Sequence, residues 1–503
     1  RGIGFSKLVA VGNESDLSVG EIGKMLVNDT NTETIILFLE TLRNSYEVAE
    51  MSKMAHAAGK QIVCYKLGKS ELGKQLAKSH TGAIAGNDDA FNAFINYHGI
   101  ARVEIFETLI EIPNLFRKKK KSESKRVGIV TTTGGGGAMV VENLSGSDVE
   151  IVDPGLPIQK IMQENNIPYN NNKLVDLTIA GTKPEIVTEV ISQMMQNKNC
   201  DVVVMVVGSS AKFRPEQAVE PLLKWANYPK PLAVYVAPDA PEALNLLHKN
   251  NIACFRTPES CAESVKTFLN TKNPVKSTIL NNHSSKISKK LNKNISKNLS
   301  EEEALEIFKD IGIEIVDYKV ISNEKQAIEH SSQIGFPLAM KVLSSEIMHK
   351  TETGGVELNI KNLEELKISF KKLSDVFQKL KIKSSDEKFL IQKMEKGIAE
   401  IILGYRVDEL VGPIVVLGSG GILSEIYNDK SIRMAPVDIT EAKKMINEVK
   451  SLVTITGYRG LPEVDINIIA TAIVNISKFA LVKEIKDAEI NPVIVKKNNE
   501  GIV

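Results

Sequence analysis

The sequence predicts an α/β protein with parallel sheets, and three observations lead to this prediction. Short apolar strands alternate with helical stretches over residues 1–116, and the same rhythm resumes at residue 127. The strand candidates at 201–207 and 231–236 are apolar almost without interruption, which is typical of parallel strands covered on both faces. A polar stretch at 271–298 then separates these parts from a third domain of mixed strands and helices.

Composition narrows the class of protein. A chain of 503 residues with 43% hydrophobic positions can form several globular domains, which excludes a disordered or fibrous protein. Lys and Arg number 63 against 62 Asp and Glu, so the net charge gives no reason to expect nucleic acid or an anionic membrane as a partner. Cysteines without paired spacing predict a reducing compartment, and neither a bilayer-spanning run nor a signal peptide is visible, so we expect a cytoplasmic protein.

The first domain is predicted at residues 1–116. Strands at 34–39 and 61–65 flank a helix at 46–58. A strand-like segment, Lys7–Val11, follows Arg1 almost directly and no initiator Met precedes it, so we expect the chain to be part of a longer protein. Residues 117–126, with four consecutive lysines, are predicted to be a solvated linker.

Two further domains follow. The second, at 127–270, begins with a strand at 127–130, and residues 271–298, with seven lysines and no acidic residue, are predicted to be a linker. The third, at 299–503, begins with a helix whose capping box is formed by Ser300 and Glu303. Residues 493–503 are predicted to form a hairpin that is cut off in its second strand.

The first segment that could carry chemistry is Ser79-His80-Thr81-Gly82-Ala83. A histidine among small residues is open to a bulky phosphate, and imidazole is a competent nucleophile near neutral pH. Taken alone, a single histidine is more often structural than catalytic.

The second segment is the glycine run Gly134, Gly135, Gly136 and Gly137, between the strand at 127–130 and an apparent helix through Leu144. Backbone N–H groups at such a turn can close on an anion, and the helix N-terminus adds partial positive charge. The run lacks the Lys-Ser/Thr ending of a P-loop, and a tight turn is the alternative.

The third segment places Lys341 inside the otherwise apolar strand 336–342, ahead of His349 in the stretch His349–Val356. A buried lysine needs an anionic partner, and a nucleotide phosphate is a suitable one. The alternative is an edge-strand lysine that reaches out to water.

The fourth group is spread over residues 389–492. Glu489 and Asn491 are two apart on a predicted strand and therefore on one face, where their oxygens suit a magnesium ion that bridges phosphates. The other candidates in this region are Gln392, Lys393, Met394, Glu400, Glu425 and Arg433.

Taken in order, these segments resemble the fused ADP-forming (NDP-forming) acetyl-CoA/acyl-CoA synthetase family, which is related to succinyl-CoA synthetase. The most specific matches are Ser79–Ala83 and His349–Val356, and the resemblance extends over essentially the whole chain. It implies two flavodoxin-like, succinyl-CoA synthetase-type domains with parallel sheets, followed by an ATP-grasp domain. It also implies a CoA-binding domain before Arg1 and a magnesium-binding Asp after Val503.

The resemblance implies a role for each candidate. His80 would be the phosphorylated histidine and Glu40 the carboxylate that orients it, while the Gly134–Gly137 loop would cradle the phosphohistidine. His349 would be a second phosphate acceptor and Lys341 a phosphate-binding lysine, and Gln392–Met394 would contact adenine. Glu489 would support phosphohistidine and Asn491 would bind magnesium, with Glu400, Glu425 and Arg433 near the nucleotide.

The implied reaction is acyl-CoA plus phosphate plus ADP to free acid, CoA and ATP, in either direction, with Mg2+, ATP/ADP and CoA as cofactors. An acyl phosphate would pass its phosphoryl group to His80, and His349 would relay it to ADP. The resemblance also suggests a homodimer. The motifs select neither the carboxylic acid nor ADP over GDP.

Two other interpretations stay open. In the first, the chain is the ligand-sensing part of a protein acetyltransferase, although a sensor has no need of both His80 and His349. In the second, it is an ATP-grasp carboxylate–amine ligase, which accounts for residues 300–503 but leaves the first 270 residues unexplained.

Overall fold

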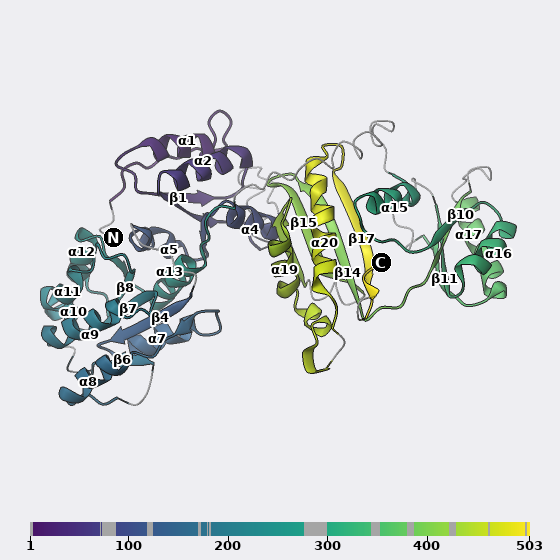
Figure 1. The fold of residues 1–503 in the computed structure, drawn as a ribbon. Coiled ribbons are helices and arrows are strands. Elements are labelled where there is room, and N and C mark those ends of the chain that lie inside the picture. The colour runs from purple at the N-terminus through teal and green to yellow at the C-terminus, as the bar shows by residue number, and fades with distance from the viewer. Residues whose placement is uncertain are drawn as a thin grey trace. The chain divides into compact units, whose positions relative to one another are not determined.

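The computed structural model divides the chain into two compact units, Arg1–Lys276 and Ser277–Val503 (Figure 1). Each unit is a layered α/β arrangement of sheets and covering helices. The residues that the structure describes are 4–70, 72, 87–117, 124–169, 173–178, 180, 183–275, 299–343, 353–379, 387–421, 429–460, 463–497 and 500–503.

The first sheet of unit 1 is parallel, with strand order β1-β2-β3. Its strands confirm the two predicted from apolar runs, and the helix predicted between them is present as α2. Helix α1 packs closely on α2, where a Cβ on Gly20 would clash with the carbonyl carbon of Glu47. The elements are β1 (Thr34–Leu39), β2 (Gln61–Lys66), β3 (Ala101–Val103), α1 (Val19–Asn28), α2 (Ser45–Ala57), α4 (Asp88–Tyr97), α5 (Phe106–Glu111) and α6 (Pro113–Phe116).

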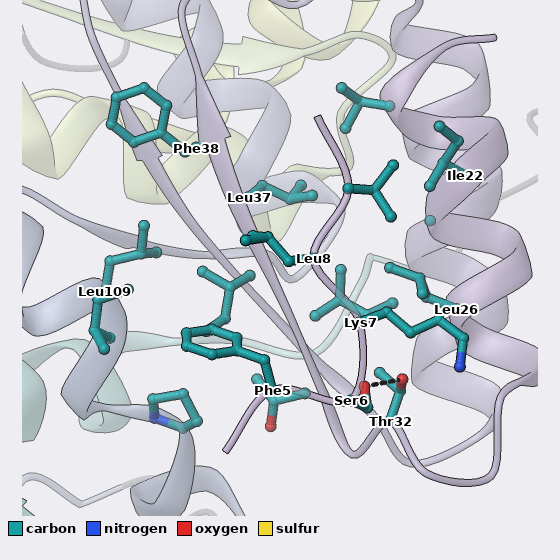
Figure 2. Close-up of a pocket in the computed structure, with 18 of the residues that line it drawn as sticks. Phe5, Ser6, Lys7, Leu8, Ile22, Leu26, Thr32, Leu37, Phe38 and Leu109 are labelled. Atoms are coloured by element: carbon teal, nitrogen blue, oxygen red, sulfur yellow. Dashed lines mark hydrogen bonds between the residues drawn. The ribbon is translucent and has the colours of Figure 1, made fainter. Parts of the chain in front are cut away.

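The prediction of a strand at Lys7–Val11 is wrong, because this segment forms no strand. The segment runs beside β1, but a cavity of about 920 Å³ opens around them, lined by both and by α5 and α6. Figure 2 shows Leu8 beside Leu37 of β1, with Leu109 of α5 on one side of the view and Ile22 of α1 on the other. An apolar segment becomes a strand only when a neighbouring strand pairs with its backbone, and here Leu8 stays 90% exposed.

The second sheet of unit 1 has six parallel strands, in the order β5-β4-β7-β8-β9 with β6 also paired to β4. Strands β7 and β8 are buried at every position, as their continuous apolar sequences predicted. The strands are β4 (Arg126–Thr131), β5 (Glu150–Ile151), β6 (Leu174–Asp176), β7 (Val202–Val207), β8 (Leu232–Val236) and β9 (Ala253–Phe255). The helices are α7 (Gly134–Leu144), α8 (Leu156–Glu164), α9 (Pro184–Gln196), α10 (Ser210–Phe213), α11 (Pro215–Leu223), α12 (Pro241–Lys249) and α13 (Pro258–Asn270).

The two halves of unit 1 share one apolar core. The second sheet and α13 pack against Leu109 of α5, Leu115 of α6 and Ile112 between these two helices. A buried hydrogen bond of 2.8 Å from Ser260 Oγ to Glu111 crosses the same boundary. The segments predicted as two domains therefore form one compact unit.

The predicted linkers lie mostly outside the described residues. This holds for 118–123 within the first linker and for 276–298 within the second. The described start of the second is attached to unit 1, because Val275 N donates to Tyr97 O at 2.8 Å. The exact domain boundaries stay predictions.

Unit 2 contains two antiparallel sheets, ordered β10-β13-β11-β12 and β16-β15-β14-β17. The capping box at Ser300 and Glu303 is confirmed, and so is the hairpin after β17, where Val503 N donates to Ile494 O. The strands are β10 (Tyr318–Ile321), β11 (Leu338–Val342), β12 (Val356–Ile360), β13 (Phe389–Lys393), β14 (Ala399–Asp408), β15 (Gly412–Ser419), β16 (Lys430–Met434) and β17 (Asp487–Val495). The helices are α15 (Glu301–Asp310), α16 (Glu324–Ile334), α17 (Leu363–Lys379), α19 (Ile439–Glu448) and α20 (Ile466–Ser477), with short 3-10 helices at Lys450–Ile455, Tyr458–Gly460 and Lys478–Leu481.

Two global features bear on the expected environment. No described helix combines the length and the apolar character needed to cross a bilayer. All four cysteines are free and buried, and burial raises the pKa of the Cys64 thiol to about 12.

The corner between α4 and β3 contains a histidine whose titration we expect to affect stability. Burial lowers the pKa of His98 from 6.5 to about 4. The centroid of its ring lies 4.4 Å from the centroid of the Phe94 ring. Between these two values the unfolded chain binds more protons than the folded one, so His98 stabilises the fold above pH 6.5 and this contribution is lost as the pH falls toward 4.

The measurement is the urea midpoint of unit 1 at pH values between 7.5 and 4.5. Unfolding is monitored by the fluorescence of Trp225, the one tryptophan in the chain. His98→Gln should flatten the acid-side loss of stability. His56→Gln, at an exposed position of α2, should not. Equal slopes for the wild type and His98→Gln would contradict the prediction.

Candidate active site

The C-terminal edge of the first sheet carries Glu40 and the strand end from which the chain continues toward His80. Glu40 follows β1 directly and is half-buried. The end of β2 lies beside it, because Leu67 N donates to Leu39 O at 2.8 Å. The chain leaves β2 at Lys66 and enters α4 at Asp88, and the segment between them contains His80 in the sequence. His80 itself lies outside the described residues.

The glycine run lies at the equivalent edge of the second sheet, where β4 ends and α7 begins. Gly136 and Gly137 are buried against strand ends, because a Cβ on either would lie 2.9 Å or less from a threonine methyl group. Gly134 and Gly135 are exposed at the helix N-terminus. Two glycines thus permit close packing, and two leave backbone N–H groups accessible to an anion.

Threonine hydroxyls hold this loop in place. Thr131 Oγ1 accepts from Thr133 N at 3.0 Å, and Thr132 Oγ1 accepts from Gly208 N at 2.9 Å, which ties the loop to the end of β7. The carboxylate of Asp176, at the end of β6, lies beside Gly134. The sequence reasoning did not find Asp176, because only the pairing of β6 with β4 brings it to this edge.

Lys341 lies on β11 of unit 2, with 24% of its side chain exposed. Its ammonium group donates to Glu301 Oε1 at 2.8 Å, from the first turn of α15. The anionic partner that burial demands is therefore supplied by the protein itself in this structure, and a phosphate would have to compete with Glu301.

The three residues predicted to contact adenine end β13 and continue past it. Gln392 pairs with Ala339 in the strand register, and Met394 N donates to Pro337 O at 3.0 Å. The ammonium group of Lys393 lies 3.5 Å from a Glu395 carboxylate oxygen.

Glu489 and Asn491 share the exposed face of β17, as the spacing of two predicted. Asn491 Nδ2 donates to Glu489 Oε1 at 3.3 Å. Glu400 is exposed on β14, which pairs with β17, and its carbonyl accepts from Gly420 N at 2.7 Å. Glu425 and His349 lie outside the described residues.

Arg433 is held by two carboxylates of α19. Its guanidinium donates to Glu441 at 2.7 Å and to Glu448 at 2.5 Å. Burial acts to lower the pKa of Arg433, but these hydrogen bonds outweigh it and raise the pKa. Arg433 thus anchors α19 to β16 in this structure, and its predicted place near the nucleotide stays a prediction.

Comparison with protein families matches both ends of the chain. Residues 1–116 match the succinyl-CoA ligase like flavodoxin domain, and residues 290–503 match an ATP-grasp domain. The fold class predicted from the sequence is confirmed by these matches together with the parallel sheets of unit 1.

Characterised relatives extend the match to the whole chain. The 4-hydroxybutyrate–CoA ligase (ADP-forming) of Nitrosopumilus maritimus is 27% identical over 514 residues, which cover 100% of this chain and 74% of that protein. The acetate–CoA ligase (ADP-forming) I subunit beta of Pyrococcus furiosus is 38% identical over 200 residues, which cover 40% of this chain and 86% of that subunit. The chain belongs to the ADP-forming acetate/acyl-CoA ligase family.

A solved structure of this ligase family matches as well. It is the dinucleotide forming acetyl-coenzyme A synthetase 1 of Ca. Korarchaeum cryptofilum in complex with coenzyme A, Ca-AMPCP and HgCl+. It is 30% identical, and the match covers 44% of this chain and 95% of that chain with a TM-score of 0.39.

In this ADP-forming ligase, the sequence reasoning missed a group of charged residues next to the His80 segment. Lys66, Asp88 and Arg102 converge at the C-terminal edge of the first sheet. A signal was present, since Lys66 ends a largely apolar strand and Lys341 lies inside another. Its partners lie on α4 and β3, and only the fold brings them together.

Proposed function

We propose that this chain performs the ADP-forming acid–CoA ligase reaction, which interconverts acyl-CoA, ADP and phosphate with a free carboxylic acid, CoA and ATP. The observation that carries the proposal is the alignment of the entire chain with an ADP-forming ligase, across both the flavodoxin-like and the ATP-grasp parts. A protein with only one of the two half-reactions would need only one of the two parts.

His80 is the proposed nucleophile. Its imidazole takes the phosphoryl group from an acyl phosphate, and the freed carboxylate leaves as the acid. Glu40 supports this role, because it lies at the sheet edge where β2 leads into the His80 segment, and a carboxylate can accept a ring N–H and fix the tautomer. The exposed N–H groups at Gly134 and Gly135 are suited to bind the phosphoryl oxygens. His349 is the proposed second acceptor, which passes the group to ADP.

The nucleotide is proposed to bind in unit 2. Lys341 contacts the nucleotide phosphates once its ion pair with Glu301 is broken. The adenine is proposed to contact Gln392, Lys393 and Met394. Glu400, Glu425 and Arg433 are proposed to lie near the nucleotide. Support for a nucleotide in this unit comes from the match of residues 290–503 to an ATP-grasp domain.

Glu489 and Asn491 fit a magnesium ion. Their carboxylate and amide oxygens lie on one exposed face of a strand, and Mg2+ commonly takes one or two protein oxygens and completes its shell with water and phosphates. Among the described residues no three His, Cys, Asp or Glu side chains form a metal cluster. Bound magnesium would neutralise phosphate charge during transfer.

For the substrate we propose only a chemical class, and we also propose a compartment and an oligomeric state. The relatives are named for 4-hydroxybutyrate, acetate and trans-feruloyl-CoA, so we propose a carboxylic acid without choosing among them. Four buried free thiols support the cytoplasm as the compartment, and near-zero net charge argues against nucleic acid or a membrane as a partner. A homodimer is proposed from the family resemblance.

The function is tested by incubating the chain with γ-labelled ATP and Mg2+, quenching in alkali, and mapping the acid-labile label by peptide. We expect label on the peptides that contain His349 and His80, and none on the His80 peptide of His349→Ala. Acid-stable label, or an ATP-binding chain without label, would overturn the proposal.

A separate prediction concerns Lys341. Lys341→Met should weaken ATP binding by about 10- to 100-fold, because one charge-assisted hydrogen bond to phosphate is lost. The matched control is Lys319→Met, at an exposed position of β10 in the same sheet. Calorimetric titration with a non-hydrolysable ATP analogue measures both, and equal affinities would remove Lys341 from the nucleotide site.

A further inference from the structure

Three charged side chains form a buried cluster where β2, β3 and α4 meet. The Arg102 guanidinium donates two hydrogen bonds of 3.1 Å to the Asp88 carboxylate, one from each terminal nitrogen. Lys66 Nζ lies 3.8 Å from the same carboxylate. The exposed fractions are 1% for the Lys66 side chain, 8% for Arg102 and 16% for Asp88, so the cluster is almost withdrawn from water.

Two cations share this one buried carboxylate. Both also lie over the ring of Phe91, with Lys66 Nζ 5.3 Å and the Arg102 guanidinium carbon 5.4 Å from its centroid. Glu104, which is about half-exposed, balances the charge from the outer side and lies 3.0 Å from Arg102 Nε. Burying ions costs several kcal/mol each, and apolar residues usually pack at least as well, so stability alone is a weak reason for the cluster.

The position of the cluster supplies a better reason. Lys66 is the last residue of β2 and Asp88 is the first residue of α4, so their ion pair closes the two ends of the segment that contains His80. A second ion pair, Lys69 to Glu104 at 3.1 Å, attaches the start of that segment to the end of β3. Glu40 lies at the neighbouring strand end.

We propose that Lys66, Asp88 and Arg102 are positioning residues that hold the two ends of the His80 segment at the sheet edge and thereby set the rate of phosphoryl transfer to His80. This inference rests on the proposed function. None of the three residues needs to touch the phosphoryl group, because their effect is on where the segment begins and ends. A small displacement of a reacting group is sufficient to slow transfer strongly.

The second sheet offers a matched control. Arg126 and Asp201 form an ion pair at the N-terminal ends of β4 and β7, with Arg126 Nε 3.3 Å from Asp201 Oδ2. The Asp201 side chain is 8% exposed, so Asp201→Asn also removes a buried carboxylate that is paired with an arginine. It lies at the edge of its sheet opposite the glycine run.

The experiment compares Asp88→Asn, Lys66→Met and Arg102→Lys with Asp201→Asn in the full chain. Three quantities are measured: the initial rate of acid-labile labelling at His80, the affinity for ATP, and the rate of tryptic cleavage after Lys69, Lys74 and Lys78. Thermal midpoints identify any variant that fails to fold, in which case the other two cluster variants decide.

We expect Asp88→Asn and Lys66→Met to slow labelling by about 10- to 100-fold and to accelerate cleavage in the segment, with ATP affinity unchanged. Arg102→Lys keeps the charge but loses the two-pronged contact, so its labelling rate should fall between these variants and the wild type. Asp201→Asn should match the wild type in all three measurements.

Two results would overturn the inference while leaving the proposed function intact. In one, the wild type is labelled at His80 and the cluster variants are labelled equally fast. In the other, cleavage accelerates but labelling slows no more than in Asp201→Asn, which would give the cluster a structural role only. A wild type without label at His80 would instead contradict the proposed function, and the inference would be contradicted as well because it rests on that function.

Discussion

Replacing His80 by alanine is expected to lower ligase turnover by at least about 10³-fold in either direction, since the step that carries the phosphoryl group loses its nucleophile. The described residues on both sides of His80 support this expectation. The chain leaves β2 and enters α4 at the C-terminal edge of a parallel sheet, where α/β proteins commonly bind ligands. Glu40 ends the neighbouring strand at that edge.

The measurement is ATP formation from acyl-CoA, phosphate and ADP, and acyl-CoA formation in reverse. ATP affinity should stay within about twofold of the wild type, because the nucleotide is proposed to bind in the other unit. His56→Ala, at an exposed position near the end of α2, serves as the control and should keep full activity. More than a tenth of wild-type turnover in His80→Ala would exclude a phosphohistidine at this position.

Replacing Tyr405 by alanine is expected to destabilise unit 2 by about 3–5 kcal/mol. The Tyr405 side chain lies in the middle of β14, is 2% exposed, and packs 5.9 Å from the ring of Phe479. Its removal leaves a cavity between the second sheet of unit 2 and the helical layer that covers it.

The two units allow a precise test of this effect. The single tryptophan, Trp225, is buried in unit 1, so its fluorescence follows unit 1 while far-UV circular dichroism follows both. Tyr405→Ala should lower the urea midpoint seen by circular dichroism and leave the Trp225 transition in place. Tyr458→Ala is the control, because Tyr458 is 48% exposed and its loss should cost less than about 1 kcal/mol. An unshifted dichroism transition for Tyr405→Ala would contradict the role of this residue in the core.

The parts of the fold predicted correctly depend on contacts that are local in the chain or on simple periodicity. The apolar runs of β7 and β8 were sufficient to predict buried parallel strands. Ser300 and Glu303 are three residues apart, so their capping box could be predicted before any packing was known. The glycine run was placed correctly at the start of α7 for the same reason.

The candidate site was predictable only where motif order carried the information. Ser79–Ala83 and His349–Val356 indicated the family, and the two-residue spacing of Glu489 and Asn491 placed them on one face. The Gly134–Gly137 run looked uniform, yet the structure separates two packed glycines from two exposed ones. That difference depends on which strand ends lie beneath the helix.

The sequence by itself determined the fold class, the family, the order of the parts and most strands, because these follow from periodicity and from motifs that are continuous in the chain. The tertiary structure alone decided that the first two predicted domains share a core, and that Lys7–Val11 lacks a strand partner. It also decided that Arg433 pairs with α19, and that Lys66 meets Asp88 and Arg102. Each of these depends on which distant segments are brought into contact, and burial makes such contacts decisive because an apolar face or a charge must find a partner when water is removed.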